Sequence, residues 1–158
     1  MTNFVINDAG LALVKYFEGL YLTASEDCVG VSTIGFGRIL YDDGSHVKNG
    51  DTCTEAQADQ WLMEDLEGDG AHYVRAWLPG LDQNQFSALT SFTFNRGAGR
   101  LRELLEMGKD PIWIQKHMLF FDYAGSPSNH ILGLQRRRRS ELALFCGGDW
   151  QQWKDWRP

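Results

Sequence analysis

The pattern of hydrophobic and polar positions divides the chain into a short leading helix, a β-rich segment and a long helical remainder. Within residues 5–19, apolar side chains recur every three or four positions, which is the period of a helix. Residues 20–41 alternate instead and are rich in β-branched, aromatic and glycine residues, so they predict a small hairpin or a three-stranded sheet. Residues 42–51 have the composition of a loop, and from residue 54 onward the spacing is helical.

Capping signals place the ends of several helices. Asn7 or Asp8 can cap the first helix, because a short side-chain oxygen accepts from the free N–H groups of the first turn. Residues 54–57 and 82–85 both have the form of a capping box, and the helix after the first box extends to about Trp77. Further helices are expected at about 100–107, 111–121 and 134–146, with a tryptophan-rich helix at the end of the chain.

These elements predict an α+β protein with a small β lobe beside a mainly α-helical lobe. The β lobe covers about residues 20–50, and the helical lobe covers about residues 54–158 together with the N-terminal helix. A length of 158 residues suits one domain of two lobes, and 43% hydrophobic and 23% charged residues are ordinary for a globular protein. No apolar stretch approaches the roughly 18 residues of a membrane span, so no membrane anchor is expected.

Charge is unevenly distributed along the chain, whose formal net charge is −6. Residues 1–80 carry 13 acidic and 4 basic side chains, whereas residues 81–158 carry 8 acidic and 11 basic ones. The acidic balance argues against a nucleic-acid partner, and the asymmetry is compatible either with a polarised cleft or with chance. The three cysteines and four histidines are widely spaced without a ligand motif, so neither a disulfide framework nor a metal or other cofactor is expected.

Two carboxylates near the N-terminus could act as a catalytic pair. Glu18 ends the first helix, Asp27 lies in the turn of the predicted hairpin, and Thr33 follows on the next strand. Glycoside hydrolysis needs one protonated and one ionised carboxyl group. The carbonyl end of a helix disfavours an ionised Glu18 and a solvated turn favours an ionised Asp27, so Glu18 suits the acid and Asp27 the base. Taken alone, a pair of this spacing is more often two surface carboxylates.

The string FEGLYLTASEDCVGVSTIGFGR, residues 17–38, joins these residues in one pattern. It resembles the active-site hairpin of the phage-type lysozymes, glycoside hydrolase family 24, in which Glu-Gly-Leu is followed at fixed spacing by Asp or Cys and then by Thr-Ile-Gly-x-Gly. The resemblance continues in QFSALTSFTFNRGAG, GLQRRRRSELALF and GGDWQQWKDW, and so covers about residues 4–156. It implies a lysozyme-like fold with the active-site cleft between the two lobes.

Carried over position by position, the resemblance implies roles for three residues. Glu18 would be the general acid, Asp27 would orient or activate a water molecule, and Thr33 would help to hold that water. The reaction would cleave the β-1,4 bond between N-acetylmuramic acid and N-acetylglucosamine in peptidoglycan, with inversion at the anomeric carbon. An inverting enzyme separates its carboxyl groups by roughly 6.5–9.5 Å.

The same resemblance assigns supporting residues. Gly37 lets the backbone approach the saccharide, and Phe94 and Asn95 border the sugar cleft. Arg137 pairs with the catalytic Glu, with one residue of uncertainty either way in the run 136–139. Because consecutive helical residues point about 100° apart, at least one arginine of this run must face inward, where it needs a carboxylate.

Three positions depart from the family pattern. Arg38 stands beside the site where the family usually has His, so it is a candidate for substrate contact or for a changed pH dependence. Ser25 replaces a common Tyr. Cys28 adjoins Asp27, and the register favours Asp27 over Cys28 as the second catalytic residue.

The resemblance further implies a phage or prophage endolysin that acts on peptidoglycan as a monomer. It would accumulate in the cytoplasm of the bacterial host and reach the wall in the periplasm after a separate protein permeabilises the membrane, since the N-terminus lacks the features of a secretion signal. A lytic transglycosylase is one alternative, against which Asp27 and Thr33 argue because that reaction needs no water-activating partner. A catalytically inactive peptidoglycan-binding relative is the other, supported only by Arg38 and Ser25.

Overall fold

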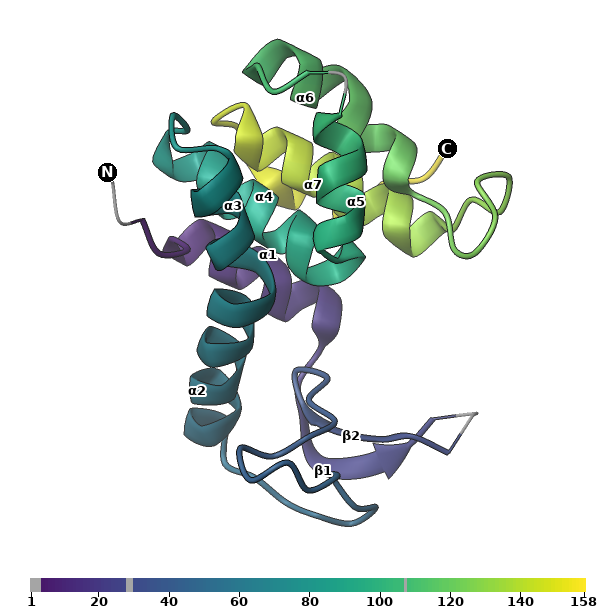
Figure 1. The fold of residues 1–158 in the computed structure, drawn as a ribbon. Coiled ribbons are helices and arrows are strands. Elements are labelled where there is room, and N and C mark those ends of the chain that lie inside the picture. The colour runs from purple at the N-terminus through teal and green to yellow at the C-terminus, as the bar shows by residue number, and fades with distance from the viewer. Residues whose placement is uncertain (1–3, 28–29, 107) are drawn as a thin grey trace. The chain divides into compact units, whose positions relative to one another are not determined.

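The structure, a computed structural model, describes residues 4–27, 30–106 and 108–158. The chain divides into two units, of which the smaller is Val14–Asp65 and the larger combines Met1–Leu13 with Leu66–Pro158. The smaller unit holds a two-stranded sheet and most of one helix, and the larger unit is helical (Figure 1). The predicted α+β class is therefore confirmed.

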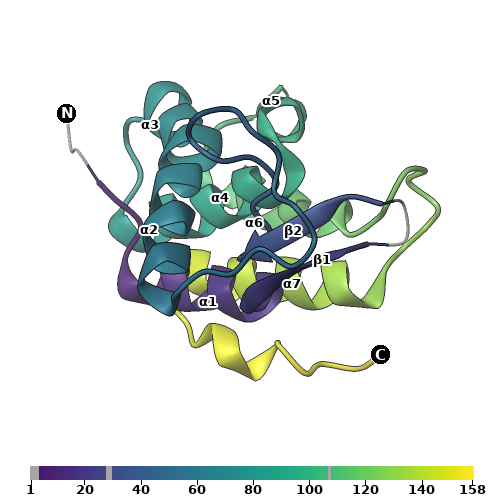
Figure 2. The same ribbon diagram turned by 90° about the horizontal axis from the view of Figure 1, so that it is seen from below.

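The smaller unit is built on an antiparallel hairpin. Strand β1 (Tyr21–Glu26) pairs with strand β2 (Ser32–Gly35), and the two lie side by side in Figures 1 and 2. The sequence left open a hairpin or three strands, and the described chain forms a two-stranded sheet. Thr23 of β1 also forms an isolated antiparallel bridge with Thr52, in the segment that follows the loop at residues 42–51. This segment lies along the edge of β1 that does not pair with β2.

A small apolar core joins the hairpin to the loop and helix that follow it. Its buried members are Ala24, Ile34 and Val47, and half-buried Tyr41, Cys53 and Trp61 pack against them. The backbone N–H of Ala24 donates to the carbonyl of Asp51 at 2.7 Å, and the Ala24 carbonyl accepts from the N–H of Gly50 at 3.0 Å. The predicted loop at residues 42–51 is therefore attached to β1 by main-chain hydrogen bonds.

Helix α1 (Asp8–Glu18) begins in the larger unit and ends in the smaller one. Asn7 is its cap, because the Asn7 Oδ1 accepts from the N–H of Gly10 at 2.9 Å. Gly19, with a φ of 73°, turns the chain away and donates to the carbonyl of Lys15 at 3.0 Å. The helix therefore ends at Glu18, as the sequence predicts.

The long second helix of the prediction is continuous but changes its winding. Helix α2 (Glu55–Leu66) opens with the predicted capping box, passes into a π-helical turn (Glu67–Ala71) and continues as α3 (His72–Trp77). A Cβ on Gly70 would lie 2.8 Å from the backbone oxygen of Thr90, closer than a real Cβ can come. Only glycine therefore lets this turn approach the helix that carries Thr90.

Helix α4 (Gln83–Arg96) is the centre of the larger unit, where it packs against α3, the π-helical turn and α7 (Leu132–Phe145). It begins with the second predicted capping box. The buried hydroxyls of Thr90 and Thr93 donate to carbonyls one turn earlier in the same helix, at 2.9 and 2.7 Å. These polar residues can therefore lie in the core without unmet hydrogen bonds.

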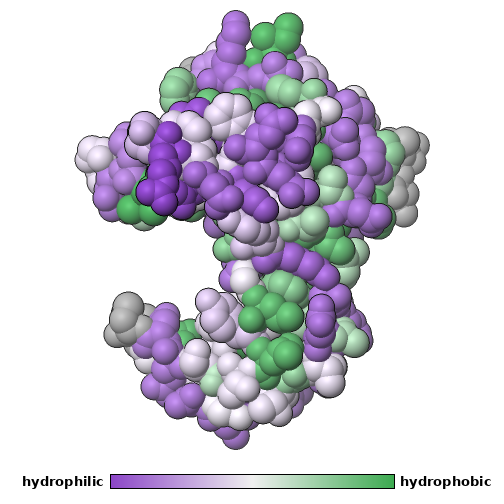
Figure 3. Space-filling view, turned by 180° about the vertical axis from the view of Figure 1, so that it is seen from behind, coloured by the Kyte–Doolittle hydropathy of each residue, from purple (hydrophilic) through white to green (hydrophobic). Residues whose placement is uncertain are grey.

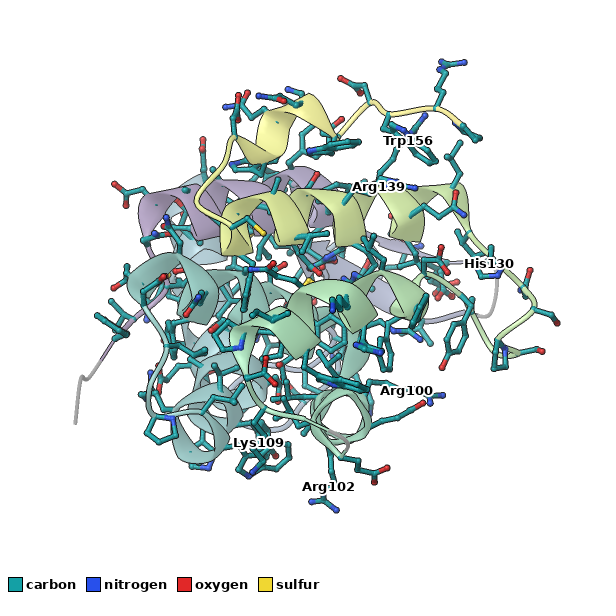
Figure 4. All side chains as sticks on the ribbon, turned by 90° about the horizontal axis from the view of Figure 1, so that it is seen from above. Arg100, Arg102, Lys109, His130, Arg139 and Trp156 are labelled. Carbon is teal, nitrogen blue, oxygen red and sulfur yellow. The ribbon has the colours of Figure 1, made fainter. Side chains whose placement is uncertain are left out.

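The other predicted helices are confirmed within two residues, except at the end of the chain. They are α5 (Ala98–Leu105), α6 (Pro111–His117) with the 3₁₀ turn Met118–Phe121, and α7. The predicted terminal helix is wrong, because only a 3₁₀ turn forms, at Trp150–Gln152. The segment packs on α7 instead: Arg136 Nε donates to the Trp156 carbonyl at 2.8 Å, and the Arg139 guanidinium lies 3.9 Å from the centre of the Trp156 ring (Figure 4).

Apolar side chains are also present at the surface. Figure 3 shows hydrophobic residues exposed on the smaller unit, whose exposed large apolar side chains include Tyr21, Leu22 and Leu40.

In the part of the chain that the structure describes, no helix combines the length and the apolar character needed to cross a membrane.

Gly68 and Gly70 offer a matched pair of substitutions in the π-helical turn. A Cβ on Gly68 meets no atom within 4 Å, so we expect Gly68→Ala to stabilise the protein by up to about 1 kcal/mol through helix propensity. Gly70→Ala forces a methyl group against the backbone of Thr90, and we expect it to destabilise the protein by about 1–3 kcal/mol. Urea denaturation of the two variants measures both changes. Effects of the same sign and size would contradict the close approach at Gly70.

Acid should weaken the attachment of the 42–51 loop. The pKa of Asp51 is lowered because its carboxylate accepts from the Lys48 N–H at 2.9 Å and from the Tyr41 hydroxyl at 2.8 Å. Such a group stabilises the fold above its unfolded pKa of about 4 and loses this effect as the pH falls through the folded value. We expect Asp51→Asn to melt below the wild type at neutral pH, with a difference that shrinks towards about pH 3. Asp69→Asn, at an exposed carboxylate, is the control and should show no such convergence.

Candidate active site

Glu18 lies beside the turn that follows β2. Its side chain is half-buried, and a Cβ placed on Gly37 would lie 4.0 Å from the Glu18 Oε2. Gly37 has a φ of 99°, which residues with a side chain rarely adopt. The Glu-Gly-Leu and Gly-x-Gly parts of the sequence pattern therefore meet in space, and the carboxylate faces main chain that carries no side chain.

Asp27 directly follows β1 at the end of the hairpin where the chain turns towards β2. Its Oδ1 accepts from the N–H of Val31 at 2.9 Å, and its own N–H donates to the Val31 carbonyl at 3.0 Å. These two bonds fix the carboxylate at an exposed corner of the smaller unit. Cys28, the alternative second catalytic residue, lies outside the residues that the structure describes.

Thr33 lies in β2 opposite Ser25 in the strand register and is half-buried. Successive residues of a strand point to opposite faces of the sheet. Ile34 is fully buried in the core with Ala24 and Val47, so Thr33 is directed to the other face. The hairpin therefore presents a hydroxyl on the side away from the core of its unit.

The guanidinium of Arg38 is engaged by partners within the smaller unit, and only 11% of the side chain is exposed. Its Nε donates to the carbonyl of Leu40 at 2.7 Å, and its Nη1 lies 3.4 Å from Glu64 and 3.7 Å from Asp65. It also forms an ion pair with Asp42. These contacts connect the turn after β2 to the end of α2, so Arg38 braces the turn that contains Gly37. Its contact with substrate stays a prediction.

The remaining predicted residues, Phe94, Asn95 and Arg137, belong to the larger unit. Phe94 is half-buried near the end of α4. The Asn95 Oδ1 accepts from the Arg138 Nη2 at 3.0 Å. The structure therefore links Asn95 to the arginine run through Arg138, the neighbour of the predicted Arg137.

Two arginines of the run face inward, in agreement with the prediction of at least one. Arg137 and Arg138 are 3% and 0% exposed, and both contact the carboxylate of Glu141, which is itself 0% exposed. Burial lowers the pKa of Arg138 to about 10, although the Glu141 carboxylate acts in the opposite direction. Sequence reasoning missed Arg138 and Glu141, and the signal that could have found them is the helical spacing of three and four residues. The pairing of Arg137 with Glu18 stays a prediction.

Comparison with known proteins identifies the family. Residues 15–141 match the sequence profile of the family described as Phage lysozyme, which is well over half of the chain. The chain belongs to the phage lysozyme family. The endolysin of Salmonella phage P22 is 38% identical over 147 residues, which cover 89% of this chain and 97% of that protein. The endolysin of Bacillus phage PZA is 34% identical over 152 residues, but this phage lysozyme spans only 55% of its length.

Solved structures agree with this family and confirm the lysozyme-like fold. The endolysin from Escherichia coli O157:H7 phage FAHEc1 superimposes with a TM-score of 0.79 at 31% identity, covering 90% of this chain and 94% of that one. The muramidase domain of SpmX from Asticaccaulis excentricus gives a TM-score of 0.73 at 32% identity, with 90% and 98% covered. The predicted membership of the phage-type lysozymes is therefore confirmed.

In this phage lysozyme, Arg38→Met should be destabilising. The substitution keeps an apolar side chain near Trp61, whose ring centre lies 5.4 Å from the guanidinium carbon, but it leaves the neighbouring carboxylates without their cation. Because the arginine is largely buried, we expect a loss of about 1–3 kcal/mol in urea denaturation. Lys15→Met, which breaks the more exposed 2.7 Å pair with Asp59, is the control and should cost less than about 1 kcal/mol. Equal losses would show that the Arg38 pairs add nothing beyond a surface contact.

Proposed function

We propose that this protein is an endolysin with muramidase activity, which hydrolyses the β-1,4 bond between N-acetylmuramic acid and N-acetylglucosamine in bacterial peptidoglycan. The observation that carries the proposal is the carboxylate of Glu18 beside the bare main chain of Gly37, in a chain of the phage lysozyme family. The names of its relatives support it, because several are endolysins and the SpmX domain is named a muramidase.

Glu18 is the general acid of the proposed reaction. It donates its proton to the glycosidic oxygen as the bond from that oxygen to the anomeric carbon breaks. Asp27 takes a proton from a water molecule, which attacks the anomeric carbon from the opposite face and inverts its configuration. The Thr33 hydroxyl can donate to a carboxylate and accept from this water, and so helps to hold it.

Access for a sugar ring supports the assignment of Glu18. A side chain at position 37 would occupy the space next to the carboxylate, whereas glycine leaves that space to a substrate. Arg38 braces the same turn through its ion pairs. In the proposed complex, Gly37, Arg38, Phe94 and Asn95 contact the glycan, and Arg137 forms an ion pair that supports Glu18.

The proposed biological role is lysis of a bacterial host. The enzyme acts as a monomer, accumulates in the host cytoplasm and reaches peptidoglycan in the periplasm after a separate protein permeabilises the membrane.

A lytic transglycosylase is the second candidate, since that reaction needs a single catalytic acid, a role that Glu18 could fill. The products distinguish the two, because a transglycosylase leaves anhydro-muramic ends whereas a hydrolase leaves reducing ends.

Isosteric substitution of the two carboxylates tests the proposal. Glu18→Gln and Asp27→Asn remove only the acid or base function, and we expect each to lower the release of reducing ends from purified peptidoglycan at least about 100-fold without changing the melting temperature. Glu26→Gln, at the last residue of β1, is the control and should retain activity.

Product masses complete the test. Activity that survives Glu18→Gln would end the assignment of that residue. Anhydro ends from the wild type would establish the transglycosylase, and a wild type that binds but does not cleave would establish an inactive relative.

A further inference from the structure

One carboxylate oxygen in the core of the larger unit receives three hydrogen bonds. The Oε1 of Glu141 accepts from the Ser91 hydroxyl at 2.7 Å, from the Arg138 Nη2 at 2.8 Å and from the Arg137 Nε at 3.2 Å. Ser91 belongs to α4 and the other three residues to α7. Glu141 is therefore the point at which the two helices and both buried arginines meet.

The charges of this cluster do not cancel. Two guanidiniums share one carboxylate, and all three residues are at most 3% exposed. Arg138 is surrounded by α4 and α7, since it also bonds Asn95 and its guanidinium lies 4.8 Å from the centre of the Phe92 ring. Arg137 and Arg138 repel each other, and Arg96 adds to the repulsion at Arg138. Arg137 and Arg138 together thus carry one positive charge more than Glu141 balances.

The two arginines use Glu141 differently. Arg138 approaches it with a terminal nitrogen and has its other contacts in the same core. Arg137 approaches it with Nε, the nitrogen nearest the chain, while its terminal Nη2 donates to the Ser91 hydroxyl oxygen at 3.5 Å, so Glu141 and Ser91 together orient this guanidinium. Glu141 therefore neutralises the one and orients the other.

We propose that Glu141 is a positioning residue for the proposed catalytic reaction. It balances the charge of Arg138 and aims Arg137, so that Arg137 remains the cation that supports the general acid. This inference rests on the proposed function, in which Arg137 pairs with Glu18. Glu141 itself touches no substrate and donates no proton.

Charge rescue tests this role. Glu141→Gln keeps the size of the side chain but leaves two buried cations that repel each other, so we expect kcat on soluble peptidoglycan fragments to fall at least about tenfold while KM stays within about twofold. In Arg138→Met, Arg137 becomes the sole arginine that neutralises Glu141, and we expect kcat of this variant to fall as well. The double variant Glu141→Gln/Arg138→Met removes one charge of each sign, and kcat should return to within about threefold of the wild type.

A purely structural role predicts other results. A folded Glu141→Gln with wild-type kcat, or a double variant no more active than either single one, would overturn the proposal. If Glu141→Gln does not fold, the double variant is compared with Arg138→Met alone. A double variant with no higher kcat than Arg138→Met would then overturn the proposal. Glu103→Gln is the matched control, because Arg100 and Glu103 form an ion pair of the same three-residue spacing on the surface of α5, and its kcat should change less than twofold.

The proposed function is tested separately in the same assay. If Glu18→Gln is inactive and Glu141→Gln is fully active, only the role of Glu141 fails. If Glu18→Gln is active, the proposed function fails, and the positioning role fails with it.

Discussion

A charge buried in a protein core needs a counter-charge, and this requirement shapes the larger unit. Breaking a buried ion pair is costly because it leaves one charge without compensation. Helix α7 buries Arg138 and Glu141 three residues apart, and α4 adds Ser91 and Asn95 to the same cluster. The contact between α4 and α7 is therefore polar at its centre, although the surrounding residues, such as Phe92 and Leu144, are apolar. Because an unpaired buried charge is costly, these bonds favour the one register of the two helices in which all of them form.

The smaller unit depends on main chain that can come close to other groups. Gly35 and Gly37 both have positive φ values, and a Cβ on Gly35 would lie 3.3 Å from the Cβ of Ala58 on α2. The first glycine thus brings the end of β2 against α2, and the second leaves room at Glu18. The same short turn supports packing on one side and the candidate site on the other, which gives a physical reason for a Gly-x-Gly pattern directly after a strand.

Local signals were predicted well from the sequence, and contacts between distant residues were not. Both capping boxes and the end of α1 at Glu18 follow from side chains within four residues of each other, so a single stretch of sequence contains the information. The terminal helix was wrong because Trp156 packs on Arg139, which is 17 positions away in the sequence, and this contact outweighs a helical pattern. The assignment of Glu18 and Gly37 to one site came from the family resemblance. Hydrophobic periodicity could not supply it, because periodicity does not relate the end of a helix to a turn 19 residues later.

The run of arginines shows why hydrophobic patterning did not select the buried pair. A hydrophobic stripe reveals the inner face of a helix through contrast between residue types, and four identical residues provide none. Helix geometry establishes only that at least one arginine faces inward, and the spacing of three and four residues to Glu141 is the additional signal that the sequence contains. The structure selects two, because the inner face of α7 at this point meets Ser91 and Asn95 rather than an apolar surface.

Arginine at position 38 follows from the charge of its surroundings. The smaller unit has 10 acidic and 3 basic side chains, and the Arg38 guanidinium lies among three of the carboxylates. A histidine there would lose its charge near neutral pH, whereas a guanidinium keeps it. The guanidinium also has five N–H donors and can bind several carboxylates and a carbonyl at once, whereas an imidazole ring has at most two donors. The departure from the family pattern at Arg38 is therefore explained by the balance of charge within the smaller unit, independently of any contact with the glycan.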